Sequence, residues 1–142
     1  MYSWNKWDDR FLCLAGVVRH WSKDPSTKVG AVIADGKRVV SMGYNGFPKG
    51  VVDLEELYNN REEKLERIVH AEINAILYAN ESLVGKTLYT FPFQCCARCA
   101  AQVIQSGIKR VVAPQSIDTK WKNSFLIANQ MFREAKVEVE LV

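Results

Sequence analysis

The sequence predicts an α/β protein built on a five-stranded mixed sheet flanked by helices, for two reasons. Segments with the character of strands alternate along the chain with segments of helical periodicity. An Asp35-Gly36 turn joins the first two strands as a hairpin, whereas later strands are joined through helices, which favours parallel pairing with right-handed crossovers. The 142 residues are 48% hydrophobic and contain no repeat or linker, so we expect one domain over residues 1–142.

The N-terminal part of the chain is expected to form a helix followed by the hairpin. Apolar residues recur there at steps of three and four, which predicts one buried stripe of a helix: Trp4, Trp7, Phe11, Leu14, Val18 and Trp21. Ser3 is a candidate N-cap, and Asp24-Pro25 ends the helix. A short apolar run at 29–34 predicts a buried strand, and residues 38–44 form the strand that returns.

A glycine-rich segment, residues 43–50, follows the hairpin. Its three glycines and one proline indicate a loop whose backbone conformation is specified. The residues alone leave two interpretations open, an ordinary turn and a backbone that approaches a ligand. The next segment, 53–67, is dense in charge and is expected to form one or two exposed helical turns. It contains neither Cys nor His, so we expect no second metal site there.

The rest of the chain is expected to alternate helices with strands. Helices are predicted at 70–80, 97–106 and 121–134, and strands at 88–91, 109–113 and 137–141. Gly107 is expected to end the second of these helices. In the last strand, apolar residues alternate with Glu138 and Glu140, which indicates one solvated face at a sheet edge.

Residues with metal-binding and acid–base chemistry gather in two segments, 70–72 and 95–99. Cys96 and Cys99 lie three apart at the beginning of a predicted helix, where side chains face one way and unpaired N–H groups favour thiolates. With His70 they would provide three protein ligands, which leaves one tetrahedral position for water, as in a catalytic zinc site. Glu72 is close enough to move protons between that water and a substrate.

Other interpretations of these residues stay open on the sequence alone. Cys95 can complete a closed zinc site, although its direction along the chain differs from that of Cys96 and Cys99. A thiol pair without metal is the remaining alternative. Cys13 and His20, on the first helix, are expected to be a small packed residue and a surface imidazole.

The His-x-Glu segment followed by Pro92 and Cys-x-x-Cys is typical of zinc-dependent deaminases, and the chain resembles the deoxycytidylate (dCMP) deaminase family along nearly its whole length. The matching segments are 22–25, 29–32, 43–50, 70–76 and 105–109. The resemblance implies a cytidine deaminase-like three-layer fold and hydrolysis of dCMP to dUMP and ammonia, which supplies thymidylate synthesis. It also implies a homohexamer that dCTP activates and dTTP inhibits, with magnesium accompanying the triphosphate.

The resemblance also implies roles for single residues. His70, Cys96 and Cys99 match the zinc ligands, and Glu72 matches the proton shuttle. Asn45 matches an asparagine that contacts the nucleoside, Ala71 lies at a substrate-contact position, and Lys28 falls near the expected substrate phosphate. The residues that match the effector loop are Gly43, Tyr44, Gly46, Pro48, Lys49 and Gly50.

Two departures from the family pattern bear on the metal. The family usually has Pro directly before the first ligand cysteine, where this chain has Cys95. Some relatives carry a second, structural zinc before His70, for which this chain lacks ligands, so one zinc per chain is expected.

Composition and motifs also weigh against other classes of protein. The formal charge of +3 is scattered, which does not favour nucleic acid as a partner. The N-terminus is not a signal peptide and no run of 18 apolar residues occurs, so we expect a cytoplasmic protein that does not enter a membrane.

Four other functions are alternatives to that of a dCMP deaminase. A tRNA or polynucleotide deaminase would need a basic and aromatic track, against which residues 46–50 and the acidic insertion argue. A free cytidine deaminase usually has Cys in place of His70, and riboflavin-pathway deaminases share the chemistry. An inactive nucleotide-binding regulator with a structural zinc would not need Glu72.

Overall fold

The computed structural model describes residues 5–142, which form a five-stranded mixed sheet in the order β2-β1-β3-β4-β5. The strands are β1 (Gly30–Asp35), β2 (Arg38–Tyr44), β3 (Thr87–Phe91), β4 (Arg110–Ala113) and β5 (Glu138–Leu141). Strand β1 pairs antiparallel with both β2 and β3, whereas β3 with β4 and β4 with β5 pair parallel. The predicted fold class is therefore confirmed, and β5 lies at the sheet edge as expected.

Six α-helices surround this sheet within the described residues. They are α1 (Lys6–Val18), α2 (Glu55–Asn59), α3 (Arg61–Arg67), α4 (Ala71–Tyr78), α5 (Ala97–Gln105) and α6 (Lys122–Glu134), with short 3₁₀ helices η1 (Arg19–Trp21) and η2 (Thr119–Trp121). No helix in residues 5–142 combines the length and apolar character that crossing a bilayer requires.

The first helix differs from its prediction at both ends. Ser3, the expected N-cap, and Trp4 lie outside the described residues, and the structure gives the cap to Asn5. The Asn5 side chain accepts from the backbone N–H groups of Trp7 at 2.8 Å and Asp8 at 3.1 Å. The α-helix ends at Val18 and continues as η1, which leaves Trp21 54% exposed rather than on the buried stripe.

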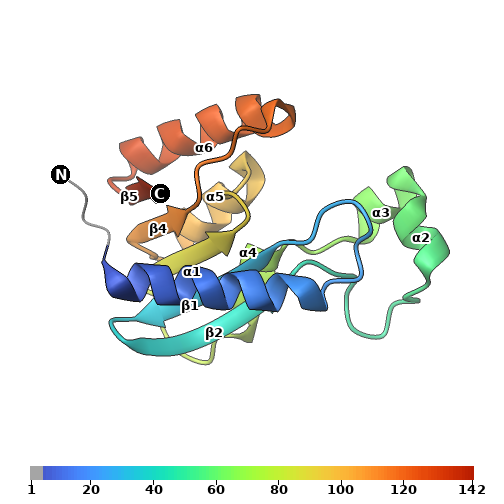
Figure 1. Cartoon of the computed structure of the whole chain (residues 1–142), viewed down its shortest axis with the longest axis horizontal. Coiled ribbons are helices and arrows are strands. Elements are labelled where there is room, and N and C mark those ends of the chain that lie inside the picture. The colour runs from blue at the N-terminus through green and yellow to red at the C-terminus, as the bar shows by residue number, and fades with distance from the viewer. Residues whose placement is uncertain (1–4) are drawn as a thin grey trace.

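The molecule has three layers, with α1 on one face of the sheet and α4, α5 and α6 on the other. Figure 1 shows α1 in front of the sheet and α4 and α5 behind it. Strand β1 serves both faces, because Val32 packs with the α1 side while Ala31 and Ile33 pack with the α4 side. This burial on two sides explains why the strand is continuously apolar in sequence.

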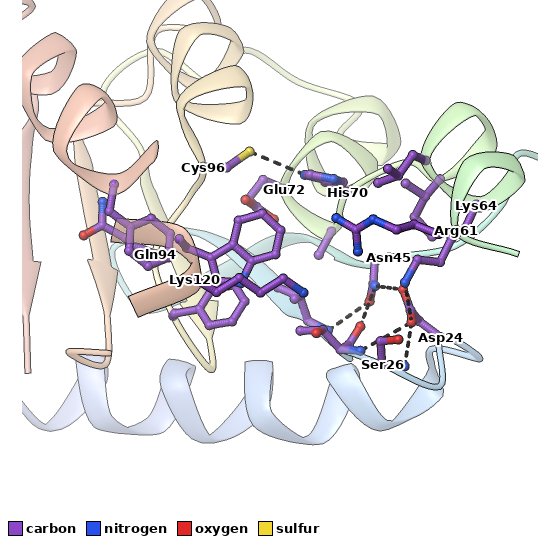
Figure 2. Close-up of a pocket in the computed structure, with 18 residues that line it drawn as sticks. Asp24, Ser26, Asn45, Arg61, Lys64, His70, Glu72, Gln94, Cys96 and Lys120 are labelled. Atoms are coloured by element: carbon purple, nitrogen blue, oxygen red, sulfur yellow. Dashed lines mark hydrogen bonds and ion pairs between the residues drawn. The ribbon is translucent and has the colours of Figure 1, made fainter. Parts of the chain in front are cut away.

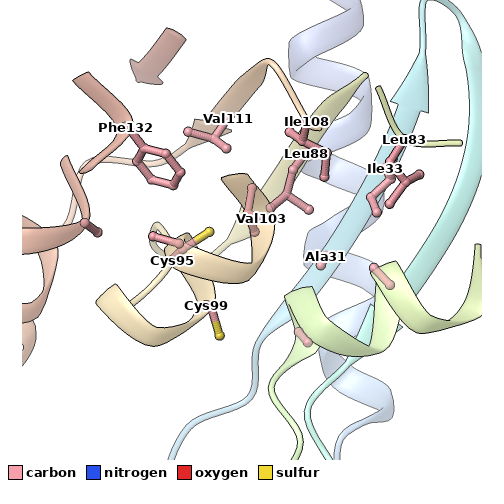
Figure 3. Close-up of a cluster of buried hydrophobic side chains, with 14 residues drawn as sticks. Ala31, Ile33, Leu83, Leu88, Cys95, Cys99, Val103, Ile108, Val111 and Phe132 are labelled. Atoms are coloured by element: carbon pink, nitrogen blue, oxygen red, sulfur yellow. The ribbon is translucent and has the colours of Figure 1, made fainter. Parts of the chain in front are cut away.

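The larger core cluster lies between the sheet and the three helices behind it. Figure 3 shows Ile33, Leu88 and Val111 of the sheet with Val103 of α5 and Phe132 of α6. Cys95 and Cys99 belong to the same cluster. Close-packed side chains of the core thus hold the segment that carries the thiols in place.

The N-termini of α4 and α5 come together on this face of the sheet. His70 is the N-cap of α4 and Cys96 is the N-cap of α5. Helices α2 and α3 project from the body near the end of α1 (Figure 1), and an isolated bridge between Gly46 and Val69 ties the segment that follows them to the β2 end.

Candidate active site

Three side chains with metal-binding atoms meet where α4 and α5 begin. The His70 Nδ1 atom lies 3.1 Å from Cys99 Sγ and 3.6 Å from Cys96 Sγ. All the ligand atoms of the three residues lie within 4.8 Å of one another, and no other such group is found in the described residues. The structure thus brings together the three residues that the sequence singled out as metal donors.

The two thiols of this group differ in pKa. Hydrogen bonds from Cys99 and His70 lower the pKa of Cys96 to about 4, which favours its thiolate form. The thiolate in turn raises the pKa of Cys99 and, through its hydrogen bond, that of His70. This cluster concentrates negative charge beside an imidazole, which is the environment that attracts a divalent cation.

The carboxylate of Glu72 lies beside this group. Glu72 sits in the first turn of α4 and is only 4% exposed. Burial raises its pKa, since the charged form loses solvation, while the nearby His70 opposes the rise. Figure 2 shows Glu72 next to His70 and Cys96 at one end of a pocket. A buried carboxyl whose pKa is raised holds a proton more readily than an exposed one, which suits it to proton transfer.

Cys95 points in a different direction from the donor Cys99 (Figure 3). It is 1% exposed, packs in the core cluster and is not part of the metal-binding group. Burial raises its pKa well above the usual thiol value, so it is a neutral thiol. The expectation that Cys95 has a different direction from Cys96 and Cys99 agrees with this position.

The pocket in front of Glu72 is lined from several segments of the chain (Figure 2). His70, Ala71, Glu72 and Cys96 line one end. An aromatic wall is formed by Phe93, Trp121 and Phe125, with ring centroids 6.2 Å apart for Phe93–Trp121 and 5.6 Å for Phe93–Phe125. Helix α3 and the residue that follows it provide four further lining residues, none of which belongs to the motifs identified in the sequence: Arg61, Lys64, Leu65 and Ile68.

Comparison with known proteins accounts for this arrangement. A family model described as the cytidine and deoxycytidylate deaminase zinc-binding region matches residues 5–115, which contain all three donors and Glu72. The chain belongs to the cytidine and deoxycytidylate deaminase family. The part of the aromatic wall from η2 and α6 lies beyond the matched residues.

Individual relatives of this deaminase extend the comparison. An uncharacterized deaminase in a luxG 3′ region of Aliivibrio fischeri is 43% identical over 138 residues, covering 95% of this chain and 92% of that protein. A probable deoxycytidylate deaminase of Drosophila melanogaster is 42% identical over 118 residues, covering 75% of this chain and 58% of that protein.

The fold of the deaminase chain also matches a solved structure. The dCMP deaminase of cyanophage S-TIM5, in complex with dCMP and dUMP, superposes with a TM-score of 0.78 at 23% identity. The match covers 99% of this chain and 100% of that chain. The predicted cytidine deaminase-like fold is thereby confirmed.

Asn45, expected at the nucleoside, lines the pocket and is 6% exposed. Its amide nitrogen donates to Thr27 O at 2.9 Å and Asp24 Oδ2 at 3.3 Å, and its Oδ1 accepts from Val29 N at 2.9 Å. Asn45 therefore holds the loop before β1 against the end of β2. One lone pair of Oδ1 remains for a ligand.

Lys28, expected near the substrate phosphate, does not line the pocket. Its ammonium donates instead to the Ser22 carbonyl oxygen, and its own carbonyl accepts from Arg19 Nε at 2.9 Å. The alternation of the extended chain explains the difference, because Thr27 and Val29 face the pocket and Lys28 turns the other way.

The residues expected to form an effector loop lie outside the pocket. Gly43 packs against α4, and Gly46 forms the bridge to Val69. Tyr44 packs edge-on against Trp21, and the Lys49 ammonium lies 4.8 Å from the centre of the Tyr78 ring. Pro48 and Gly50 belong to the turn closed by the Val51 N–H to Pro48 O bond of 3.2 Å.

Several residues that line the pocket are not predicted from the sequence. Gln94 is 7% exposed and bonds to Asn129 of α6 at 2.8 Å, which no local pattern indicates. Trp121 and Phe125 are four apart and hence share a helix face, a signal that identifies the helix but not the pocket it faces. Arg61 and Lys64 belong to the charged segment 53–67, which the sequence predicts to be exposed to solvent.

Proposed function

We propose that this chain hydrolyses dCMP to dUMP and ammonia with one zinc ion per chain. The observation that carries the proposal is a buried carboxylate, Glu72, beside a His70–Cys96–Cys99 group at the end of a pocket. Family membership and relatives that are named deoxycytidylate deaminases support dCMP as the substrate. A free cytidine deaminase is less favoured because His70 stands where that class usually has Cys.

The donor set fits zinc. Tetrahedral zinc with Zn–N and Zn–S bonds of ordinary length places nitrogen and sulfur ligands about 3.6 Å apart. The His70 to Cys96 separation is 3.6 Å and the His70 to Cys99 separation is 3.1 Å, so small shifts bring all three onto one ion. When bound, zinc lowers the pKa of a coordinated water to about 7 and thus supplies a nucleophile near neutral pH.

Glu72 carries the protons in this proposal. Its carboxylate accepts a proton from the attacking water and passes it to the ring nitrogen of cytosine. It then takes the remaining water proton from the hydroxyl group now on C4 and delivers it to the amino group, so that the C4–N bond breaks, the carbonyl of dUMP forms and ammonia leaves. Burial suits Glu72 to this shuttle, because a raised pKa lets the carboxyl hold a proton between the two transfers.

The remaining pocket residues bind and orient the nucleotide. The aromatic wall of Phe93, Trp121 and Phe125 offers flat surfaces that exclude water from the base. Asn45, with its amide fixed by Asp24 and Val29, is placed to receive a sugar hydroxyl. Ala71 carries no bulk into the pocket and so leaves room beside the metal position.

Regulation and assembly follow from the resemblance. We propose a homohexamer that dCTP activates and dTTP inhibits, with magnesium accompanying the triphosphate and the 43–50 loop holding the effector. The dUMP formed would feed thymidylate synthesis in the cytoplasm, and no nucleic acid is expected as a partner.

A side-by-side assay tests the proposal. The zinc-loaded protein is given dCMP, dCTP, cytidine and a tRNA anticodon stem, each with and without dCTP and dTTP as effectors. We expect dCMP to be turned over with the highest kcat/KM. Faster deamination of the RNA or of free cytidine would contradict the substrate assignment, and no zinc-dependent turnover of any of them would contradict the enzyme.

A further inference from the structure

We propose that Arg61 and Lys120 form a two-sided cationic clamp at the pocket mouth that recognises the 5′-phosphate and so selects nucleotides over nucleosides. The inference rests on the proposed function, because it concerns the same pocket. It assigns phosphate recognition to α3 and η2, neither of which contains a residue of the deaminase motifs.

Among the described residues, the cationic side chains that line the pocket are of two kinds. One forms an ion pair with a carboxylate, and the others do not. Besides His70, the cationic residues are Arg61, Lys64 and Lys120, and the carboxylates are Asp24 and Glu72. Both carboxylates are 4% exposed. Glu72 faces the metal donors, so Asp24 is the carboxylate that can pair with the cations of the pocket mouth.

Lys64 is committed to Asp24. Its ammonium lies 3.2 Å from Asp24 Oδ1, and the two side chains are 14% and 5% exposed. The same Oδ1 also accepts from the Ser26 N–H at 2.9 Å and from the Thr27 N–H at 3.3 Å. If Lys64 bound a phosphate instead, the buried carboxylate of Asp24 would lose its ion-pair partner, which would cost free energy. Lys64 therefore anchors α3 to the loop before β1.

Arg61 and Lys120 remain available. Within residues 5–142 neither forms an ion pair with a carboxylate, and the recorded contact of Lys120 is with the Trp121 ring, 5.3 Å from the ring centre. Arg61 is one helical turn before Lys64, so the Lys64–Asp24 ion pair also fixes the position of Arg61. Figure 2 shows Arg61 and Lys120 on opposite sides of the pocket.

This placement suits a phosphate dianion. A guanidinium offers paired donors to two phosphate oxygens, and an ammonium adds a point charge from the other side. Figure 2 shows Glu72, His70 and Cys96 together on one side of the pocket, with Arg61 and Lys120 reaching in from different segments and Asn45 beside Asp24. A nucleotide whose base reaches Glu72 would then have its phosphate between the two cations.

The test compares nucleotide with nucleoside in single and double variants. Arg61→Gln, Lys120→Gln and the double variant are assayed for kcat/KM on dCMP and on deoxycytidine, and for binding of dUMP and deoxyuridine by calorimetry. We expect each single variant to weaken dCMP and dUMP severalfold and the double variant at least about tenfold, mainly in KM, with nucleosides unchanged. Arg61→Lys should recover part of the loss.

Lys122→Gln is the matched control, because it removes one exposed positive charge close to Lys120 from a residue that does not line the pocket. Equal losses for nucleoside and nucleotide, or the same loss in the Lys122 control, would overturn the clamp. If dCMP is not turned over but dUMP binding still depends on Arg61 and Lys120, the proposed reaction fails while the clamp stands.

Discussion

Glu72 is the residue on which the proposed chemistry turns, and its amide variant isolates that chemistry from metal binding. Glu72→Gln keeps the shape of the side chain but cannot move protons, so we expect kcat for dCMP to fall by at least about 10²-fold to 10⁴-fold with zinc content unchanged. Steady-state kinetics and zinc analysis of the same sample provide the measurement. Glu66→Gln, on the exposed surface of α3, is the control. Near-normal turnover would remove Glu72 from the mechanism.

The neighbouring cysteines give a paired prediction about the metal. Cys96→Ser should lose zinc, because it removes a donor that lies 3.6 Å from His70. Cys95→Ser should keep zinc, because Cys95 lies in the core cluster outside the donor group. Zinc affinity measured by competition with a chelator should drop in the first variant by more than the 10–100-fold typical of losing a supporting residue. Full zinc binding in Cys96→Ser would transfer the role to Cys95.

At the scale of residues, the site residues at the beginnings of helices are predictable from the sequence. The pocket residues that depend on how distant segments pack together are not. His70, Cys96 and Cys99 were predicted because helix starts fix their direction. Lys28 was misplaced because its neighbours, not Lys28 itself, face the pocket. Arg61 and Lys120 line one pocket from segments far apart in the chain, which depends on tertiary structure that no local pattern encodes.

At the scale of elements, a buried charge ties α1 to the sheet. Asp8 of α1 is 1% exposed and accepts from Arg110 at 2.8 and 2.7 Å and from the Tyr89 hydroxyl at 2.8 Å. Burial alone would raise the pKa of Asp8, but the hydrogen bonds from Arg110 and Tyr89 outweigh it and lower that pKa. The carboxylate thus stabilises the fold above its unfolded pKa.

Asp8→Asn should therefore lower the free energy of unfolding by about 3 kcal/mol at pH 7, because it leaves the mostly buried Arg110 with only the more distant carboxylate of Glu138, 3.8 Å away. Because the folded pKa is lowered, the contribution of Asp8 is lost as pH falls below about 4 through that folded value. Urea unfolding at several pH values should show a wild-type stability that falls across this range and a flatter dependence in the variant. Parallel pH curves would contradict the assignment.

Gly43 lets β2 and α4 approach closely. A Cβ at this position would lie 2.5 Å from both Ala71 O and Ala75 N, so α4 would have to move. Gly43→Ala should destabilise the protein by about 1–3 kcal/mol and weaken zinc binding, since His70 and Glu72 move with α4. Thermal unfolding and zinc titration provide the measurement, with Gly16→Ala as the control, because a Cβ there would meet only ordinary contacts at 3.8 Å. Normal zinc binding with a changed response to dCTP would favour a role in effector binding instead.

The predicted elements agree with the structure wherever periodicity and caps point the same way. Each strand begins within one residue of its expected start. The change from α1 to η1 was not predictable, because Arg19, His20 and Trp21 continue the helical pattern and only the tertiary position of Trp21 reveals the exposed side.

At the scale of the whole molecule, apolar side chains are exposed on the edge strand β2 and on α4. They are Val39, Met42, Tyr44, Leu77 and Tyr78, which are 38–70% exposed. Such surfaces commonly mark subunit contacts. We predict that sedimentation velocity will find a homohexamer and that Leu77→Glu will shift the distribution to smaller species. A wild-type monomer over the working concentration range would contradict the proposed assembly.

The coordination of the metal tests the central claim most directly. X-ray absorption at the zinc edge of the zinc-loaded protein should show two sulfur ligands at about 2.3 Å, one imidazole nitrogen at about 2.0 Å and one ligand not supplied by the protein. The spectrum should be unchanged in Cys95→Ser. A third sulfur in the wild-type spectrum that disappears in Cys95→Ser would show a closed, structural site and contradict the deaminase mechanism.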